Sequence, residues 1–392
     1  MNSLWRQLAI ATNWPVLVAV AVLTSFGTIS IYAHDAGDGG KQIVFAVVGL
    51  LLLIAIQTVN YQVFVRFAWG FYFLSLIPVA YTVLGAMLGN GQKGDHPLPF
   101  VYNVNGAYAW LTIGPVGLQP AELTKLSFIM VMAHYLRYRD NYRTFKGLMA
   151  PFLLAVVPLG LILKQPDLGT GLTFIPALFA MVFVAGSKMR HLFAIVGMGL
   201  ALVPIVWLSG TNVPVFNHLP KLVKDYQRER VYGLLSNSEA NKDVNYQPLM
   251  AEMAMGNGGW TGKGFGKIPV GVRLPEAHND MIFAIIGEQF GFVGSMVVLV
   301  AYIVLFAAGI EISAATREPF GKLAAVGIVA LMAGQAFINL MVVTRLMPVT
   351  GITLPFVSYG GSSLLASFLS VGLLLNIGQN RPLIMARDAF EY

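Results

Sequence analysis

Apolar stretches of about 18 residues or more recur along the whole chain, and they constrain its fold more than any other feature. A stretch of this length crosses a bilayer as a helix, because a helix satisfies its own backbone hydrogen bonds there. Only 11% of the residues are charged, whereas soluble proteins carry about a quarter. We therefore predict an all-α polytopic membrane protein. Cytoplasmic loops explain the net charge of +7, so no nucleic-acid partner is expected.

Ten spans are predicted, and they form a single integral membrane domain over residues 1–392. They cover residues 13–33, 42–59, 64–88, 119–136, 148–165, 170–186, 190–209, 279–311, 321–344 and 359–378. The first span is too long for a signal-peptide core, and no small-residue cleavage pattern follows it, so no cleavable signal is expected. The chain has no cysteine, which excludes a disulfide, a thiol nucleophile and a thiolate metal site.

The placement of Lys and Arg orients these spans. With the N-terminus in the cytoplasm, the inner segments hold Arg6, Arg66, Arg137, Arg139, Arg143, Lys146, Lys188, Arg190, Arg317, Lys322, Arg381 and Arg387. The short outer loops hold only Lys41, Lys93, Lys164 and Arg345. Because cytoplasmic loops are enriched in Lys and Arg, we predict that both termini are cytoplasmic. Three segments then face outward: 89–118, 345–358 and the large loop 210–278 between spans 7 and 8.

Polar residues cluster where the large loop meets the eighth span. Asn279 or Asp280 could cap the start of this helix, by accepting hydrogen bonds from its free N–H groups. Alternatively, Asp280 is a functional carboxylate at the membrane boundary, where a lipid-linked substrate presents its head group. Glu288 lies about two turns deeper and is a second buried carboxylate. It lies between Gly287 and Gly291, whose spacing would let another helix approach closely.

Two further sites carry ionisable residues near outer span ends. Glu122 and Lys125 are three residues apart and share a helical face in the fourth span. Ionisable groups within spans are costly and usually paired, so these two form an internal ion pair or line a functional cavity. Asp167 precedes the sixth span, and we predict that it caps this helix.

The large outer loop contains a predicted amphipathic helix at 219–235, which could lie along the membrane surface. Arg230 falls on its apolar side, where it either snorkels or meets an anion. Arg228 falls on the polar side and is expected to face water. A glycine-rich run at 255–266 lacks the spacing of a P-loop and is only a weak phosphate-binding signal.

Residues 347–363 contain two prolines and three glycines between the last two spans. They predict a broken or re-entrant segment, which a membrane protein tolerates only where protein buries it or a wet cavity forms. Two function classes fit these features. One is a transporter or flippase, and the other is an enzyme acting on a lipid-linked substrate at the outer face. The polar residues lie mostly at outer span ends, which favours the enzyme.

The sequence resembles the SEDS family (shape, elongation, division and sporulation) of bacterial cell-wall polymerases over nearly its whole length. Four blocks carry this resemblance, at 105–125, 165–170, 275–291 and 348–363. The sequence of residues 165–170, Gln-Pro-Asp-Leu-Gly-Thr, resembles that of the elongation branch, RodA, more than that of the division branch, FtsW.

The resemblance implies a peptidoglycan glycosyltransferase that polymerises lipid II at the outer face of the bacterial cytoplasmic membrane during cell elongation. The acceptor 4-hydroxyl would attack C1 of the donor sugar with inversion, and undecaprenyl pyrophosphate would leave. A lipid-linked precursor flippase or a division-branch polymerase is the alternative. Asp280 falls on the family's essential aspartate and is the expected general base. The other expected substrate-binding or cavity-lining residues are Glu122, Lys125, Arg230, His278, Glu288, Ser358 and Ser362.

The resemblance also implies a divalent cation, Mg²⁺ or Mn²⁺, whose ligands it does not identify. The implied partners are a class B penicillin-binding protein, as transpeptidase, and the elongation machinery. Three departures from the family pattern stand out. Tyr108 and Ala109 replace two arginines, Met250-Ala251 replaces a Gln-Ser pair, and Arg345 replaces a glycine. Because of these departures, an alternative function is that of a scaffold protein of the same family without polymerase activity.

Overall fold

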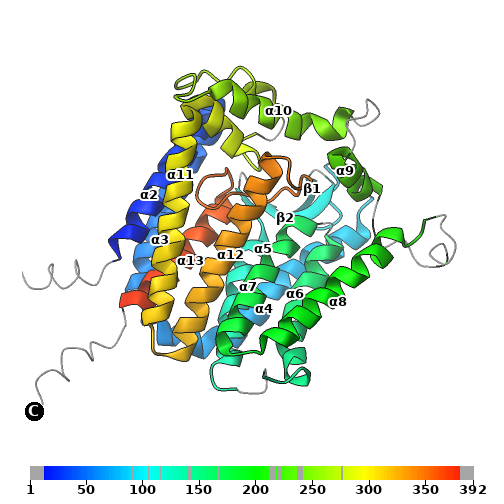
Figure 1. Ribbon diagram of the computed structural model, residues 1–392, viewed down its shortest axis with the longest axis vertical. Helices are drawn as coiled ribbons and strands as arrows, with labels where there is room; N and C mark the ends of the chain where they lie inside the picture. Colours follow the sequence, from blue (N-terminus) through cyan, green and yellow to red (C-terminus); the bar gives the residue numbers. More distant parts are fainter. Residues whose placement is uncertain are drawn as a thin grey trace, which may run out of the picture.

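Long helices packed side by side make up most of the computed structural model (Figure 1). The structure describes residues 13–379 except 91, 93, 105, 115, 140–142, 166, 212–217, 219–222, 224, 236–241 and 275–276. The long helices are α2 (Trp14–His34), α3 (Ala36–Gln57), α4 (Tyr61–Leu88), α5 (Pro120–Leu136), α6 (Met149–Lys164), α7 (Leu168–Ala185), α8 (Met189–Leu208), α11 (Ile282–Ala315), α12 (Pro319–Val343) and α13 (Gly361–Gln379). The predicted all-α polytopic membrane fold is confirmed.

Each of the ten predicted spans corresponds to one of these helices. Within the described residues, nine helices are long and apolar enough to cross a membrane, and the tenth, α5, has 17 residues. Two boundaries differ from the prediction. α3 begins at Ala36 instead of residue 42, because Asp35 caps it by accepting the Asp38 N–H at 2.9 Å. α11 begins at Ile282 instead of residue 279, because residues 277–280 form a turn.

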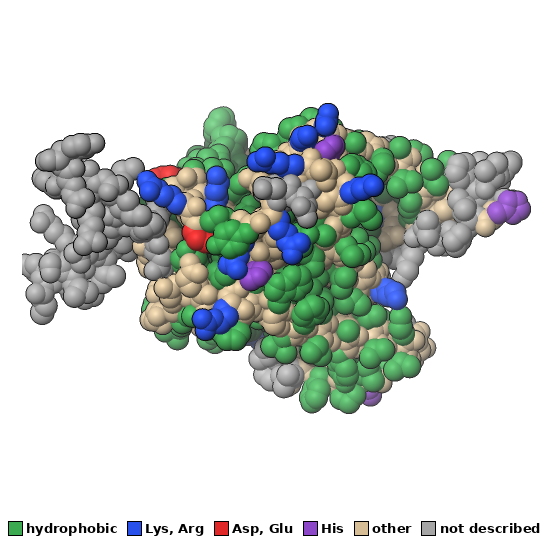
Figure 2. All heavy atoms as spheres, turned by 90° about the horizontal axis from the view of Figure 1, so that it is seen from below, with side chains coloured by type: hydrophobic (Ala, Val, Ile, Leu, Met, Phe, Trp, Pro, Cys, Tyr) green, Lys and Arg blue, Asp and Glu red, His purple; other side chains and the backbone are tan. Residues whose placement is uncertain are grey.

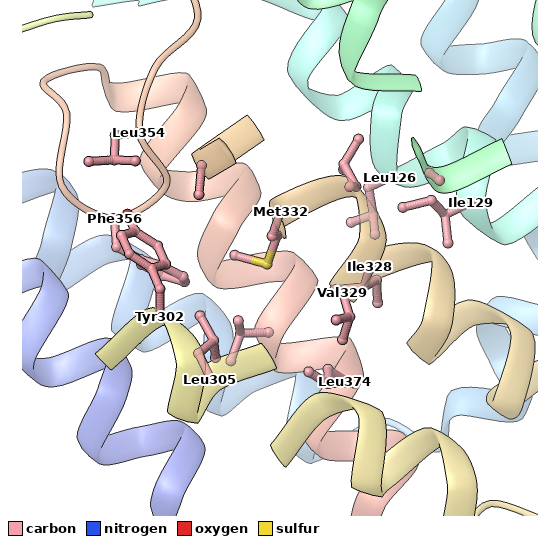
Figure 3. Close-up of a cluster of buried hydrophobic side chains, with 14 of the residues drawn as sticks. Leu126, Ile129, Tyr302, Leu305, Ile328, Val329, Met332, Leu354, Phe356 and Leu374 are labelled. Carbon is pink, nitrogen blue, oxygen red and sulfur yellow. The ribbon is translucent and has the colours of Figure 1, made fainter. Parts of the chain in front are cut away.

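Protein, rather than lipid, surrounds most of α5. Almost all of its side chains are buried, including both of its ionisable residues near the N-terminal end, and α4 and α12 pack against it. Figure 3 shows Leu126 and Ile129 of α5 in one apolar cluster with Ile328 and Met332 of α12. A helix that carries charged groups can therefore sit within the bundle without exposing them to lipid.

The first predicted outer loop contains a three-stranded antiparallel sheet that was not expected. Its strands are β1 (Val101–Val104), β2 (Ala107–Ile113) and β3 (Val116–Leu118), in the order β1-β2-β3. Leu111 pairs with Val101 on one side and Leu118 on the other. β2 is rich in aromatic and branched residues, which favour strands. Gly106, with φ +86°, makes the turn between β1 and β2.

The large loop folds into α9 (Asp225–Leu235), α10 (Lys242–Gly258) and the 3₁₀ helix η4 (Gly271–Arg273). α9 is shorter than the predicted helix at 219–235, of which residues 219–222 and 224 lie outside the described residues. α9, α10 and the sheet gather at one end of the bundle, here called the loop end (Figure 1). On the opposite end, Lys and Arg side chains predominate over Asp and Glu (Figure 2).

α10 lies directly against the first turns of α11. A Cβ added at Gly258 of α10 would lie 1.9 Å from the backbone oxygen of Gly287, so only glycine permits this approach. Gly291, with φ +65°, interrupts α11, and the N–H of Phe292 beyond it donates to Gly259 at 2.8 Å. The prediction of a close helix approach is confirmed for Gly287, which faces Met255 of α10, whereas Gly291 faces residues 260–262 beyond the end of that helix.

Glu288 fastens the large loop to α11. Its side chain is fully buried, and its carboxylate accepts hydrogen bonds from Asn257 Nδ2 at 2.7 Å, the Val270 N–H at 3.1 Å and the Gly271 N–H at 2.7 Å. These donors come from α10 and from the start of η4. Three N–H donors compensate the burial of the carboxylate. That Glu288 also lines a substrate cavity stays a prediction.

The chain between α12 and α13 leaves the helical state, and its second half, from Ile352 to Ser358, lies mostly inside the protein. Figure 3 shows Leu354 and Phe356 of this segment beside Tyr302 of α11, and both are buried. Glycines on two helices give it room. A Cβ at Gly27 of α2 would lie 2.4 Å from the Val357 oxygen, and one at Gly169 of α7 would lie 2.3 Å from the Thr350 oxygen. The predicted break between the last two spans is confirmed, and protein buries residues 352 and 354–358 of it.

We predict that Glu288→Gln destabilises the protein. Glutamine keeps the shape but places an NH₂ group where one carboxylate oxygen accepts an N–H, so a buried donor loses its partner. The expected loss is roughly 1.5–3 kcal/mol, measured as a lower melting temperature of the detergent-solubilised protein. Glu311→Gln, on the exposed side of the same helix, is the matched control. Equal melting temperatures for the two variants would contradict this role of Glu288.

Candidate active site

Asp280 lies at the loop end, in the turn between η4 and α11. It is 7% exposed. Met281 occupies the N-cap position of α11, so neither Asn279 nor Asp280 is the N-cap that one interpretation of the sequence assigned to them. The backbone oxygen of Asp280 accepts a hydrogen bond from Asn339 Nδ2 of α12 at 2.7 Å. The turn that carries the Asp280 carboxylate is therefore fixed through its backbone to the helical bundle.

His278 lies in the same turn and faces groups from two other helices. Its ring centroid is 5.4 Å from that of His34 at the end of α2 and 5.4 Å from that of Tyr359. Its Nε2 is 3.9 Å from Asp38 Oδ2 of α3. Burial, reinforced by the Asp38 carboxylate, raises the pKa of the Tyr359 phenol, which favours its neutral form.

Sequence reasoning missed His34 and Asp38 as neighbours of His278, which precedes the candidate base by two residues. It ended the first span at residue 33 and began the second at residue 42, which left both in a turn without a role. A usable signal was present, because residues 34–41 hold four ionisable side chains between two apolar spans: His34, Asp35, Asp38 and Lys41.

Glu122 and Lys125 form the ion pair that their spacing predicted. Lys125 Nζ lies 2.8 Å from Glu122 Oε1, and both side chains are buried. The pair lies in the first turns of α5, a helix against which α4 and α12 pack. That these two residues also line a substrate cavity stays a prediction.

Ser358 and Ser362 hold the re-entrant segment in place. Ser358 Oγ accepts the Leu354 N–H at 2.7 Å, which closes a tight turn. Ser362 Oγ accepts the Gln119 N–H at 2.9 Å and donates to the Gly117 oxygen at 3.1 Å. Both serines are buried and use their hydroxyls on backbone groups; that they line a cavity stays a prediction.

A pocket of about 510 Å³ opens between α9 and the start of α7. Asp167 and Arg230 supply its charged groups, and Asp280 is not part of its lining. Asp167 caps α7 as predicted, accepting the Thr170 N–H at 2.9 Å, and it also accepts Gln119 Nε2 at 3.0 Å. The other lining residues are Gly106, Ala107, Leu168, Gly169, Trp207, Val223, Gln227, Val231, Pro348, Val349 and Thr350.

Of the two arginines of α9, Arg228 is the more buried and Arg230 the more exposed, which is the reverse of the prediction. Arg228 is half-buried, and its Nη2 donates to the backbone oxygens of Trp207 at 3.1 Å and Ser209 at 2.6 Å. Arg230 is exposed, and its Nη1 donates to the Val349 oxygen at 2.8 Å. The prediction that Arg228 faces water is wrong. α9 packs beside the end of α8. The last carbonyl groups of a helix have no N–H donor within the helix, so here they accept hydrogen bonds from the Arg228 guanidinium.

Two of the residues that depart from the family pattern, Tyr108 and Arg345, have local partners in the structure. The Tyr108 hydroxyl donates to Asp95 Oδ2 at 2.7 Å and, with the N–H of Asn90, lowers the pKa of that carboxyl. Arg345 follows the end of α12 with φ +55°, the left-handed conformation that favours glycine after a helix. Its Nη1 lies 3.1 Å from Glu252 Oε2, so it ties α12 to α10.

Within the part of the chain that the structure describes, no group of three or more His, Asp or Glu side chains is placed to hold a metal ion. The expected divalent cation therefore has no group of three such ligands among those residues.

Comparisons with known proteins connect this site to a family. The family model of FtsW, RodA and SpoVE, described as cell cycle protein, matches residues 1–382. A relative from Trichlorobacter lovleyi, named "Probable peptidoglycan glycosyltransferase FtsW", is 35% identical over 390 residues, which cover 95% of each chain. A solved structure described as "Structural coordination of polymerization and crosslinking by a peptidoglycan synthase complex" contains a chain of 29% identity and TM-score 0.77. The match covers 95% of this protein and 99% of that chain.

The crystal structure of Thermus thermophilus rod shape determining protein RodA gives 29% identity and TM-score 0.67, over 95% of this protein and 98% of that chain. Relatives of both the FtsW and RodA branches thus match nearly the whole chain, so the preference for the RodA branch stays a prediction. This protein belongs to the FtsW/RodA/SpoVE family, the SEDS family that its sequence resembles.

Proposed function

We propose that this protein is a peptidoglycan glycosyltransferase that polymerises lipid II into glycan strands. Its family membership and its similarity to a relative with that activity in its name support the reaction class. The main evidence for the location of the active site is the position of Asp280. Its carboxylate is almost buried, and the backbone of its turn is hydrogen-bonded to α12. A base held in this way meets the need of glycosyl transfer for a fixed proton acceptor.

In the proposed reaction, the 4-hydroxyl of the acceptor sugar attacks C1 of the donor sugar. Asp280 takes the proton of that hydroxyl as the C–O bond forms. The bond from C1 to the polyprenyl pyrophosphate breaks, and the leaving group carries away the electron pair. A base within hydrogen-bond reach of the attacking hydroxyl contributes roughly 10²–10⁴-fold to the rate of such a step.

The leaving pyrophosphate needs positive charge nearby, and Arg230 is the candidate. It is the basic side chain of the pocket between α9 and the start of α7, and guanidinium groups match phosphate geometry. The exposed position of Arg230 leaves the site open to a large lipid-linked substrate. Arg228, which holds the end of α8, has a structural role instead.

We further propose that the loop end faces the cell exterior and that both termini are cytoplasmic. The predominance of Lys and Arg over acidic groups at the opposite end supports this orientation (Figure 2). The resemblance to a chain of a peptidoglycan synthase complex supports a class B penicillin-binding protein as partner. A divalent cation remains a proposal from the family resemblance.

Replacing Asp280 tests the reaction and the base together. Asp280→Asn keeps the size and polarity of the side chain but cannot take a proton, so polymerisation of lipid II in detergent should fall roughly 10²–10⁴-fold. Asp35→Asn is the matched control at the same end of the bundle. Asp35 caps α3, and asparagine caps about as well as aspartate, so this variant should keep its activity.

Detergent removes the need to cross a membrane, so the same assay separates an enzyme from a flippase. A wild-type protein that moves lipid II across vesicles but forms no polymer in detergent would contradict the proposed function. An Asp280→Asn variant that polymerises as fast as Asp35→Asn would contradict the assignment of the base.

The orientation is tested by single cysteines, because the natural chain has none. Lys263→Cys, in an exposed loop beyond α10, should react with a membrane-impermeant thiol reagent in intact cells. Lys146→Cys, exposed before α6, should react only after the membrane is opened. The reverse pattern of labelling would overturn the proposed orientation.

A further inference from the structure

Asn339 of α12 is a buried amide that holds two non-helical segments at once. It is 1% exposed, and its Nδ2 donates to the backbone oxygens of Asp280 and Ile352, each at 2.7 Å. The side-chain amide nitrogen carries two N–H groups, so both can be used on these carbonyls. Neither carbonyl belongs to a helix, and a buried carbonyl without a donor is costly.

The proposed reaction requires these two segments to keep a fixed position relative to each other. One carries Asp280, the proposed base. The other carries Ile352 and, two residues earlier, Thr350, which lines the pocket that contains Arg230. A second hydrogen bond, from the Tyr359 N–H to the His278 oxygen at 2.8 Å, joins the same two segments. Their relative position thus depends on a small number of bonds at one junction.

We infer that Asn339 is a positioning residue for glycosyl transfer, which sets the place of Asp280 relative to the wall of the pocket. This inference rests on the proposed function. Asn339 acts through backbone oxygens and does not itself need to touch the substrate. A displacement of a reacting group by about 1 Å costs on the order of 10²-fold in rate. Removing the Asn339 hydrogen bonds should therefore lower the rate of glycosyl transfer as well as the melting temperature.

The chain contains a matched control for the structural part of this effect. Asn376 of α13 is fully buried, and its Nδ2 donates to the backbone oxygens of Ile56 and Val59, both at 2.6 Å. These two carbonyls lie at the junction of α3 and α4, at the end of the bundle opposite Asp280. Replacing either asparagine removes two hydrogen bonds to non-local backbone from a buried site.

The experiment compares Asn339→Leu with Asn376→Leu in detergent. Melting temperatures should fall for both. Initial rates of lipid II polymerisation are measured across lipid II concentrations, at a temperature at which both variants are folded. Asn339→Leu should lose about 10²-fold in kcat with KM little changed, whereas Asn376→Leu should keep the wild-type kcat.

A double variant adds a readout that a purely structural role would not produce. Once Asp280→Asn has removed the base, adding Asn339→Leu should cost no further rate, because nothing remains for Asn339 to position. Should Asn339→Leu fail to fold, Asn339→Ser and Asn376→Ser make the same comparison with a smaller, polar side chain.

Two outcomes would overturn the inference while leaving the proposed function intact. One is an equal kcat for the Asn339 and Asn376 variants while Asp280→Asn is inactive. The other is a full additional loss of rate in the double variant. A fully active Asp280→Asn variant is a different result, because it would remove the base assignment itself and this inference with it.

Discussion

Backbone that leaves the helical state inside a membrane protein needs hydrogen-bond donors and acceptors from the protein, because lipid offers none. The segment between α12 and α13 meets this requirement with side chains from three helices. Asn339 of α12 donates to Ile352, Tyr302 of α11 to Pro355, and Gln42 of α3 to Ser358. The path of the segment therefore depends on the packing of α3, α11 and α12 around it.

These hydrogen bonds from three helices explain how a non-helical segment can keep the Asp280 carboxylate in a fixed position. The same segment contacts the Asp280 turn through Asn339 and Tyr359, and it contacts α9 through the bond between Val349 and Arg230. The proposed base and the proposed phosphate-binding arginine are thus both connected to this one segment. Positioning of this kind suits a transfer between two large lipid-linked sugars, where the protein must fix geometry more than supply new chemistry.

The features that were predictable from the sequence depend on neighbours along the chain. Hydropathy located the spans, the three-residue spacing identified the Glu122–Lys125 pair, and Asp167 was recognised as a cap. The features that were missed depend on distant partners. Arg228 was expected in water because helical periodicity does not reveal the end of α8 beside it. Glu288 takes its donors from residues 17 to 31 positions away, which no local pattern indicates.

The most direct test of the account is a structure of the Asp280→Asn variant with lipid II bound, because this variant should bind substrate without consuming it. The account predicts that the acceptor 4-hydroxyl oxygen lies within about 2.6–3.2 Å of the side chain at position 280. It also predicts the donor pyrophosphate beside Arg230. An acceptor hydroxyl bound away from position 280, with the pyrophosphate outside the pocket, would contradict the central claim.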